Sequence, residues 1–208
     1  MAMFKRAFIF ASIVISGIGV AYLVFRDQPL RNVPLRSTGP ILFFGDSLVE
    51  GVGASTGHDL PNLLERGLGE PVLNYGIAGD TTRQGLARVS SAVIEHPRVA
   101  IILLGGNDFL QKIPREETFE NLRSIISAFQ SDGAAIVLIG VRSGIIGGGA
   151  DGWYETLAEE TKSLYIEDIL KGVFGDPALM SDAVHPNDRG YEKISERIIS
   201  EIAPLLDN

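Results

Sequence analysis

Three side chains in this sequence have the types and positions that nucleophilic acyl transfer requires. Ser47 stands in a Gly-Asp-Ser-Leu tetrapeptide directly after residues 41–44, an apolar run with the length and composition of a buried strand. Asp182 precedes His185 by three residues, close enough in a tight turn for its carboxylate to accept the Nδ1 proton of the imidazole. Nε2 of the same ring is then free to take a proton from a serine hydroxyl. Ser47, Asp182 and His185 are therefore candidates for such chemistry, to be weighed together with the other features of the chain.

Two loops can supply hydrogen bonds to a developing oxyanion. Gly79 follows the apolar run 71–75 and can present an unobstructed backbone N–H. Asn107 follows the run 98–104 and offers a side-chain amide. Ligands of open α/β sheets bind beyond the carboxyl ends of the strands. Together with the backbone N–H of Ser47, these two groups would therefore form a three-donor oxyanion hole at that edge.

Each of these features also has a purely structural explanation. Ser and Asp cap helices, and Gly, Asn and Asp dominate turns for backbone reasons. The other two histidines, His58 and His96, lie near helix ends and lack an acid partner in their local sequence. Asp46 and Asp108 are interpreted as acceptors that organise loops, because one histidine with scattered carboxylates is a poor ligand set for a metal. The sequence therefore predicts neither a metal nor another cofactor.

Short apolar runs alternate with amphipathic stretches from residue 41 onward, and this alternation indicates how the candidate residues are positioned. Runs such as 99–104 and 135–139 are apolar on both faces, as expected of a parallel sheet covered by helices on each side. The predicted strands are residues 40–45, 71–75, 98–104, 134–141 and 164–167. The predicted helices are residues 58–68, 82–95, 115–131 and a final helix with Asn187 as its N-cap. The pattern predicts an α/β fold, a three-layer α/β/α sandwich with a five-stranded parallel sheet.

The charge distribution argues against nucleic acid as a partner. Of the 18 basic and 26 acidic residues, five basic residues and one acidic residue lie within residues 1–36, so the rest of the chain is strongly acidic. Such a body repels polyanions and anionic lipid surfaces. The absence of cysteine excludes thiol catalysis, thiolate metal sites and disulfides.

The N-terminal segment predicts export and contact with a membrane. Residues 7–25 carry no charge and are long enough to span a bilayer as a helix. Lys5 and Arg6 precede them, as in a signal peptide or a signal anchor, and a clear cleavage site is lacking, which favours the uncleaved anchor. We expect a signal anchor or signal peptide over 1–25, an extended linker over 26–39 and a hydrolase domain over 40–208. The body would be periplasmic or otherwise extracytoplasmic, tethered to the inner membrane unless the segment is removed.

Four short motifs stand in a fixed order along the chain: Gly-Asp-Ser-Leu at 45–48, the block around Gly79, Gly-Asn-Asp at 106–108 and Asp-x-x-His at 182–185. In this order they resemble the four blocks of the SGNH (GDSL-type) hydrolases. The residues within the motifs are most similar to those of the bacterial lysophospholipase-like esterases and acyl thioesterases. The resemblance covers about residue 40 to the C-terminus. It implies a flavodoxin-like sheet and a serine esterase. By this resemblance Ser47 would be the nucleophile, His185 the base and Asp182 the acid that orients it. Gly79 and Asn107 would join the Ser47 N–H in the oxyanion hole. Val49 stands where members often carry Ser or Thr, and residues 142–152 do not match the family pattern.

Substrate preference depends on the residues around the predicted site. Phe109, Leu110, Ile145 and Ile146 can line an acyl pocket, although they are equally consistent with ordinary core positions. The favoured substrates are esters or thioesters of lipophilic acyl groups, either small molecules or lipids. The alternatives are a carbohydrate O-deacetylase of the same family and a catalytically silent binding domain at the membrane.

Overall fold

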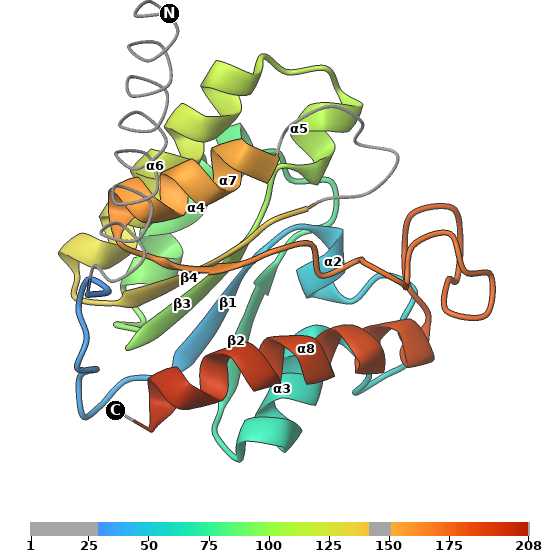
Figure 1. Ribbon diagram of the computed structural model, residues 1–208, viewed down its shortest axis with the longest axis horizontal. Helices are drawn as coiled ribbons and strands as arrows, with labels where there is room; N and C mark the ends of the chain where they lie inside the picture. Colours follow the sequence, from blue (N-terminus) through green and yellow to red (C-terminus); the bar gives the residue numbers. More distant parts are fainter. Residues whose placement is uncertain (1–28, 142–150, 208) are drawn as a thin grey trace, which may run out of the picture.

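A five-stranded parallel sheet forms the centre of the computed structural model, which describes residues 29–141 and 151–207 (Figure 1). The strand order is β2-β1-β3-β4-β5, and each neighbouring pair is parallel. The strands are β1 (Ile41–Gly45), β2 (Val72–Gly76), β3 (Val99–Leu103), β4 (Ala135–Ile139) and β5 (Leu164–Ile166). Since β1 pairs with β2 on one side and β3 on the other, the order of the chain reverses beside β1. A ligand crevice is expected just beyond the carboxyl end of such a strand.

Helices cover both faces of the sheet because the strands are apolar on both faces. Ile41 and Phe43 belong to one buried cluster, and Leu42 and Phe44 belong to the other. The first cluster includes side chains from α2 (Ser47–Glu50), α3 (Leu60–Leu68) and α8 (Asp188–Leu206). The second includes side chains from α4 (Thr82–Val93), α6 (Arg115–Ser131) and α7 (Asp151–Thr161). Figure 1 shows these groups as two layers on opposite sides of the sheet.

The predicted fold class is confirmed, and three helices were not predicted. The five strands and the four predicted helices are present, and the Asn187 side chain caps α8 by accepting a hydrogen bond from the N–H of Gly190. The unpredicted helices are α2, α7 and α5 (Gly106–Leu110). α2 and α5 are only four and five residues long, too short to show a periodic pattern. Both immediately follow strands and carry residues of the predicted site.

Residues 29–39, which the sequence analysis assigns to a linker, are held against the body. The Asn32 amide donates to the carbonyl oxygens of Gln130 and Ala134, and the Arg36 guanidinium donates to the carbonyl oxygens of Pro97 and Asp132. These acceptors immediately precede β3 and β4 or end the helix before β4. The segment is therefore fixed at the edge of the sheet opposite the carboxyl ends of the strands.

The predicted N-terminal apolar helix lies outside the described residues. Within residues 29–141 and 151–207, no helix has the length and apolar character needed to cross a membrane.

Candidate active site

The turn after β1 brings Ser47 to the carboxyl edge of the sheet. Asp46 is the N-cap of α2, and its carboxylate accepts a hydrogen bond from the N–H of Leu48 at 3.1 Å. The helix ends after one turn at Gly51, whose φ of 98° is in the left-handed region that glycine favours. Gly45 allows β1 to pass close to its neighbours, since a Cβ there would lie 2.5 Å from the carbonyl oxygen of Leu103. Ser47 is thus held in a compact turn rather than in a free loop.

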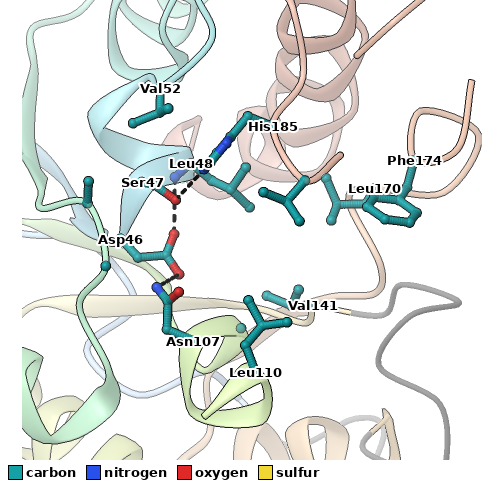
Figure 2. Close-up of a pocket in the computed structure, with 14 residues that line it drawn as sticks. Asp46, Ser47, Leu48, Val52, Asn107, Leu110, Val141, Leu170, Phe174 and His185 are labelled. Carbon is teal, nitrogen blue, oxygen red and sulfur yellow. Dashed lines mark hydrogen bonds between the residues drawn. The ribbon is translucent and has the colours of Figure 1, made fainter. Parts of the chain in front are cut away.

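Ser47, His185 and Asp182 form a continuous chain of hydrogen bonds. His185 Nε2 lies 3.0 Å from Ser47 Oγ, although the two residues are 138 positions apart. His185 Nδ1 lies 2.8 Å from Asp182 Oδ2. Figure 2 shows the imidazole pointing at the serine hydroxyl from the loop before α8. The arrangement allows a proton to pass from Ser47 to His185 while the carboxylate stabilises the imidazolium.

Asp182 is held as a carboxylate by its own loop. Its Oδ1 accepts hydrogen bonds from the N–H groups of Val184 and His185, each at 2.8 Å. The Val184 N–H has the largest influence, and with the His185 ring it lowers the pKa of Asp182 to about 2. The loop is closed by a hydrogen bond of 2.9 Å from the Ser181 N–H to the His185 carbonyl oxygen. Asp182 is therefore ionised at any pH where an esterase would work.

Gly79 and Asn107, the other two predicted oxyanion donors, border the same pocket as Ser47. Gly79 has a φ of 84°, in the region that glycine favours, and has nothing within 4 Å of the position of a Cβ. The Asn107 amide donates to the carbonyl oxygen of Asp80 at 3.0 Å and to Asp46 Oδ2 at 3.4 Å. The structure therefore brings all three predicted donor residues together at one edge of the sheet.

Asp46 and Asp108 accept hydrogen bonds from the loops around them, as interpreted from the sequence. Asp108 is buried and accepts from the N–H of Thr82 at 2.8 Å and from the Thr118 hydroxyl at 3.2 Å. Asp46 is also buried, and the loss of hydration raises its pKa to about 7. Within the described residues, no group of three or more potential ligand side chains could hold a metal ion.

An apolar pocket of about 280 Å³ opens beside Ser47. Of the predicted lining residues, Leu110 borders it, whereas Phe109 is not among its lining residues and is 39% exposed. Ile145 and Ile146 lie outside the described residues. The apolar lining that the sequence analysis missed consists of Leu48, Val52, Val141, Leu170, Phe174 and Val184. Figure 2 shows that Val141, Leu170 and Phe174 approach from the same side of Ser47. They come from two separate segments, the residues just after β4 and the turn after β5, so the approach of Val141 to the other two has no signal in the local sequence.

The fold and the geometry of the site together define a class of protein. A serine on a sharp turn after a parallel strand, facing a histidine–aspartate pair, is the arrangement of α/β serine hydrolases. The sequence matches the GDSL-like Lipase/Acylhydrolase family over residues 43–193. The chain belongs to this family of SGNH (GDSL-type) hydrolases, whose four motifs it carries in order, and it is a serine esterase.

Individual relatives agree with this assignment. The chain is 32% identical to the "Arylesterase" of Vibrio mimicus over 80% of this chain and 89% of that protein. It is 29% identical to "Thioesterase 1/protease 1/lysophospholipase L1" of Escherichia coli (strain K12) over 90% of this chain and 94% of that protein. Among solved structures, it is similar to "Crystal Structure of TesA" with a TM-score of 0.76 and 28% identity, over 80% of this chain and 99% of the other.

Proposed function

We propose that the chain hydrolyses esters or thioesters of lipophilic acyl groups through an acyl-enzyme on Ser47. The observation that carries the proposal is the chain of hydrogen bonds from Ser47 through His185 to Asp182 at the mouth of an apolar pocket. The names of the relatives, an arylesterase and a thioesterase/lysophospholipase, support the same substrate class.

In the first half of the reaction, Ser47 Oγ attacks the carbonyl carbon while its proton passes to His185 Nε2. The carbonyl π electrons move onto oxygen, and the resulting oxyanion is stabilised by the backbone N–H groups of Ser47 and Gly79 and by the Asn107 amide. When the tetrahedral intermediate collapses, the bond to the leaving alcohol or thiol breaks and His185 gives that group its proton. The acyl group is then an ester of Ser47.

In the second half, water takes the place of the alcohol. His185 accepts a proton from water as its oxygen attacks the acyl carbon, and the second tetrahedral intermediate releases the acid and restores the Ser47 hydroxyl. Asp182 stays ionised throughout, because the hydrogen bonds from its loop depress its pKa to about 2. No step requires a metal or another cofactor.

The pocket supports an apolar acyl group as the part of the substrate that is recognised. Its side-chain lining is mostly aliphatic, with one aromatic residue, Phe174. Burying an apolar chain there is favourable by roughly 0.8 kcal/mol for each CH₂ removed from water. Catalytic efficiency should therefore rise with acyl length until the pocket is full.

We propose in addition that residues 7–25 anchor the protein in the inner membrane, or are removed on export, with the hydrolase domain in the periplasm. Residues 26–30 separate the apolar run from Arg31, the first of the described residues that hydrogen bonds to the body, and five residues reach about 17 Å. An anchored body would then direct its catalytic edge away from the bilayer. This arrangement favours substrates that arrive from the aqueous side.

A panel of acyl esters from acetyl to long-chain, with an acyl thioester and a lysophospholipid, tests the substrate class. We expect kcat/KM to rise from acetyl to medium chains and Ser47→Ala to reduce turnover to background. Preference for acetyl esters would favour the carbohydrate O-deacetylase, and inactivity of the wild type on every compound would favour a silent binding domain.

A further inference from the structure

The structure assigns a positioning role to the buried ion pair between Asp80 and Arg88. We propose that this pair keeps the three oxyanion donors aimed at a common point, although neither side chain touches the reacting atoms. The inference rests on the proposed function of Gly79, Asn107 and the Ser47 N–H.

The ion pair lies directly behind the site. Arg88 is on α4, and its Nε lies 2.6 Å from Asp80 Oδ2. Only 17% of the Arg88 side chain and 9% of the Asp80 side chain are exposed. The guanidinium also lies over the ring of Phe44, 4.2 Å from its centroid. A pair so shielded from water is screened much less than a surface ion pair.

This single guanidinium connects the segments that carry the three donors. Arg88 Nη2 donates to the carbonyl oxygen of Gly45 at 2.8 Å, two residues before Ser47. Asp80, the partner of Nε, directly follows Gly79 in the chain. The carbonyl oxygen of the same Asp80 accepts the Asn107 amide at 3.0 Å. The turn of the nucleophile, the glycine loop and the asparagine are thus joined through one ion pair.

The expected effect on catalysis follows from the geometry of oxyanion stabilisation. Donors act fully only when they are already aimed at the position of the oxyanion, and a misplacement of about 1 Å can cost roughly 100-fold in rate. Lysine at position 88 would keep the charge but could not hold Asp80 and the Gly45 carbonyl at once, because it lacks the planar fork of arginine. A purely structural ion pair would instead change thermal stability and leave the rate of the folded enzyme unchanged.

The test compares Arg88→Met and Arg88→Lys with Arg83→Met. Arg83 lies on the same helix but pairs with Glu117 at the surface, with 72% of its side chain exposed. Each enzyme is assayed below its unfolding temperature on a medium-chain p-nitrophenyl ester and titrated with an alkyl trifluoromethyl ketone, which forms a tetrahedral adduct with the serine. We expect both Arg88 variants to lose about 10- to 100-fold in kcat, with KM changed by less than about threefold. The inhibition constant of the ketone should rise in parallel with the fall in kcat/KM, and Arg83→Met should behave as wild type.

A double-mutant cycle with Asn107→Ala separates positioning from a general disturbance. If Arg88 acts through the donors, Arg88→Met should cost much less in the Asn107→Ala background than in the wild type. Asp80→Asn, which removes the charge but little volume, provides the same comparison if the Arg88 variants fail to fold. Unchanged kcat and ketone affinity in a folded variant, or full additivity with Asn107→Ala, would overturn the inference. Loss of the proposed function itself would be recognised separately, because Ser47→Ala and Asn107→Ala would then leave turnover unchanged.

Discussion

Two histidine–aspartate pairs in this molecule have nearly the same geometry and lie at opposite edges of the sheet. His185 Nδ1 is 2.8 Å from Asp182, and His96 Nδ1 is 2.9 Å from Asp132. The first pair follows the carboxyl ends of the strands. The second lies where α4 and α6 end and the chain turns into β3 and β4. Only 19% of the His185 side chain is exposed, against 70% for His96.

The difference between the pairs lies in what surrounds the imidazole. His185 presents Nε2 to Ser47 Oγ, with the proposed oxyanion donors and an apolar pocket beside it. The aspartate of the other pair also binds Arg36, which fastens the N-terminal segment. A carboxylate that orients an imidazole is therefore an ordinary structural device. We propose that it takes part in catalysis only where a serine and preorganised donors share the same edge.

The largest expected effect comes from removing each histidine in turn. His185→Ala should lower kcat by about 10⁴- to 10⁶-fold, since the Ser47 proton loses its acceptor. His96→Ala should stay within about twofold of wild type, because its ring is exposed and distant from the pocket. Steady-state hydrolysis of a p-nitrophenyl ester measures both. Comparable losses of kcat in the two variants would contradict the assignment of a catalytic role to His185 and a structural role to His96.

Replacing the aspartate of each pair should again lower kcat only for the pair at the site, by a smaller factor than removal of the histidine. Asp182→Asn should reduce kcat by about 10²- to 10⁴-fold, because an amide cannot stabilise the imidazolium and disturbs its tautomer. Asp132→Asn should leave kcat unchanged and alter only thermal stability. If Asp182→Asn kept wild-type kcat, the orienting role of this carboxylate would have to be abandoned.

Two asparagines extend the comparison from the bases to the hydrogen-bond donors. Asn107→Ala should cost about 10²- to 10³-fold in kcat with little change in KM, as expected for an oxyanion donor. Asn32→Ala, at the other edge, removes a donor from the carbonyl oxygens of Gln130 and Ala134, the first of which still accepts from the Gly133 N–H, and should lower the free energy of unfolding by about 1–3 kcal/mol. Kinetics and urea unfolding on both variants would show whether function and stability separate in this way.

The smallest effect concerns pH and the buried acid beside the nucleophile. Burial raises the pKa of Asp46 from 3.8 to about 7, so the folded state binds a proton that the unfolded chain releases. The stabilising contribution of this group is complete below pH 4 and is lost as the pH rises through 7. From pH 5 to pH 8 the wild type should lose roughly 1–3 kcal/mol of unfolding free energy relative to Asp46→Asn. Parallel pH profiles for the two proteins would contradict the raised pKa.

The sequence predicted the elements that position the site better than it predicted the residues that enclose it. Strands β1, β3 and β4 are apolar throughout, and Asn187 marks the start of α8. Local sequence patterns were therefore sufficient to predict the strands and most of the helices that form the three layers. The buried residues Tyr154, Leu157 and Ala158 have helical spacing in α7, which is a local signal that the prediction of helices did not include.

Contacts between distant segments escaped prediction because they have no local signal. His96 lacked an obvious acid partner in its neighbouring sequence, yet it meets Asp132, and the Ser55 hydroxyl beside His58 binds Asp188 from 133 positions away. The pair of Asp182 and His185 was visible because its members are three residues apart. Val141 meets Leu170 and Phe174 only after the chain has folded, so the shape of the pocket could not be predicted from the sequence.

The most direct test of the account is to identify the residue that becomes covalently modified. A p-nitrophenyl alkylphosphonate should react with the wild type, release one p-nitrophenol per chain and leave one phosphonyl group on Ser47, as peptide mass spectrometry would locate it. His185→Ala should be labelled far more slowly, His96→Ala at the wild-type rate, and Ser47→Ala not at all. Labelling of a different residue, or unchanged labelling of Ser47→Ala, would contradict the assignment of Ser47 as the nucleophile.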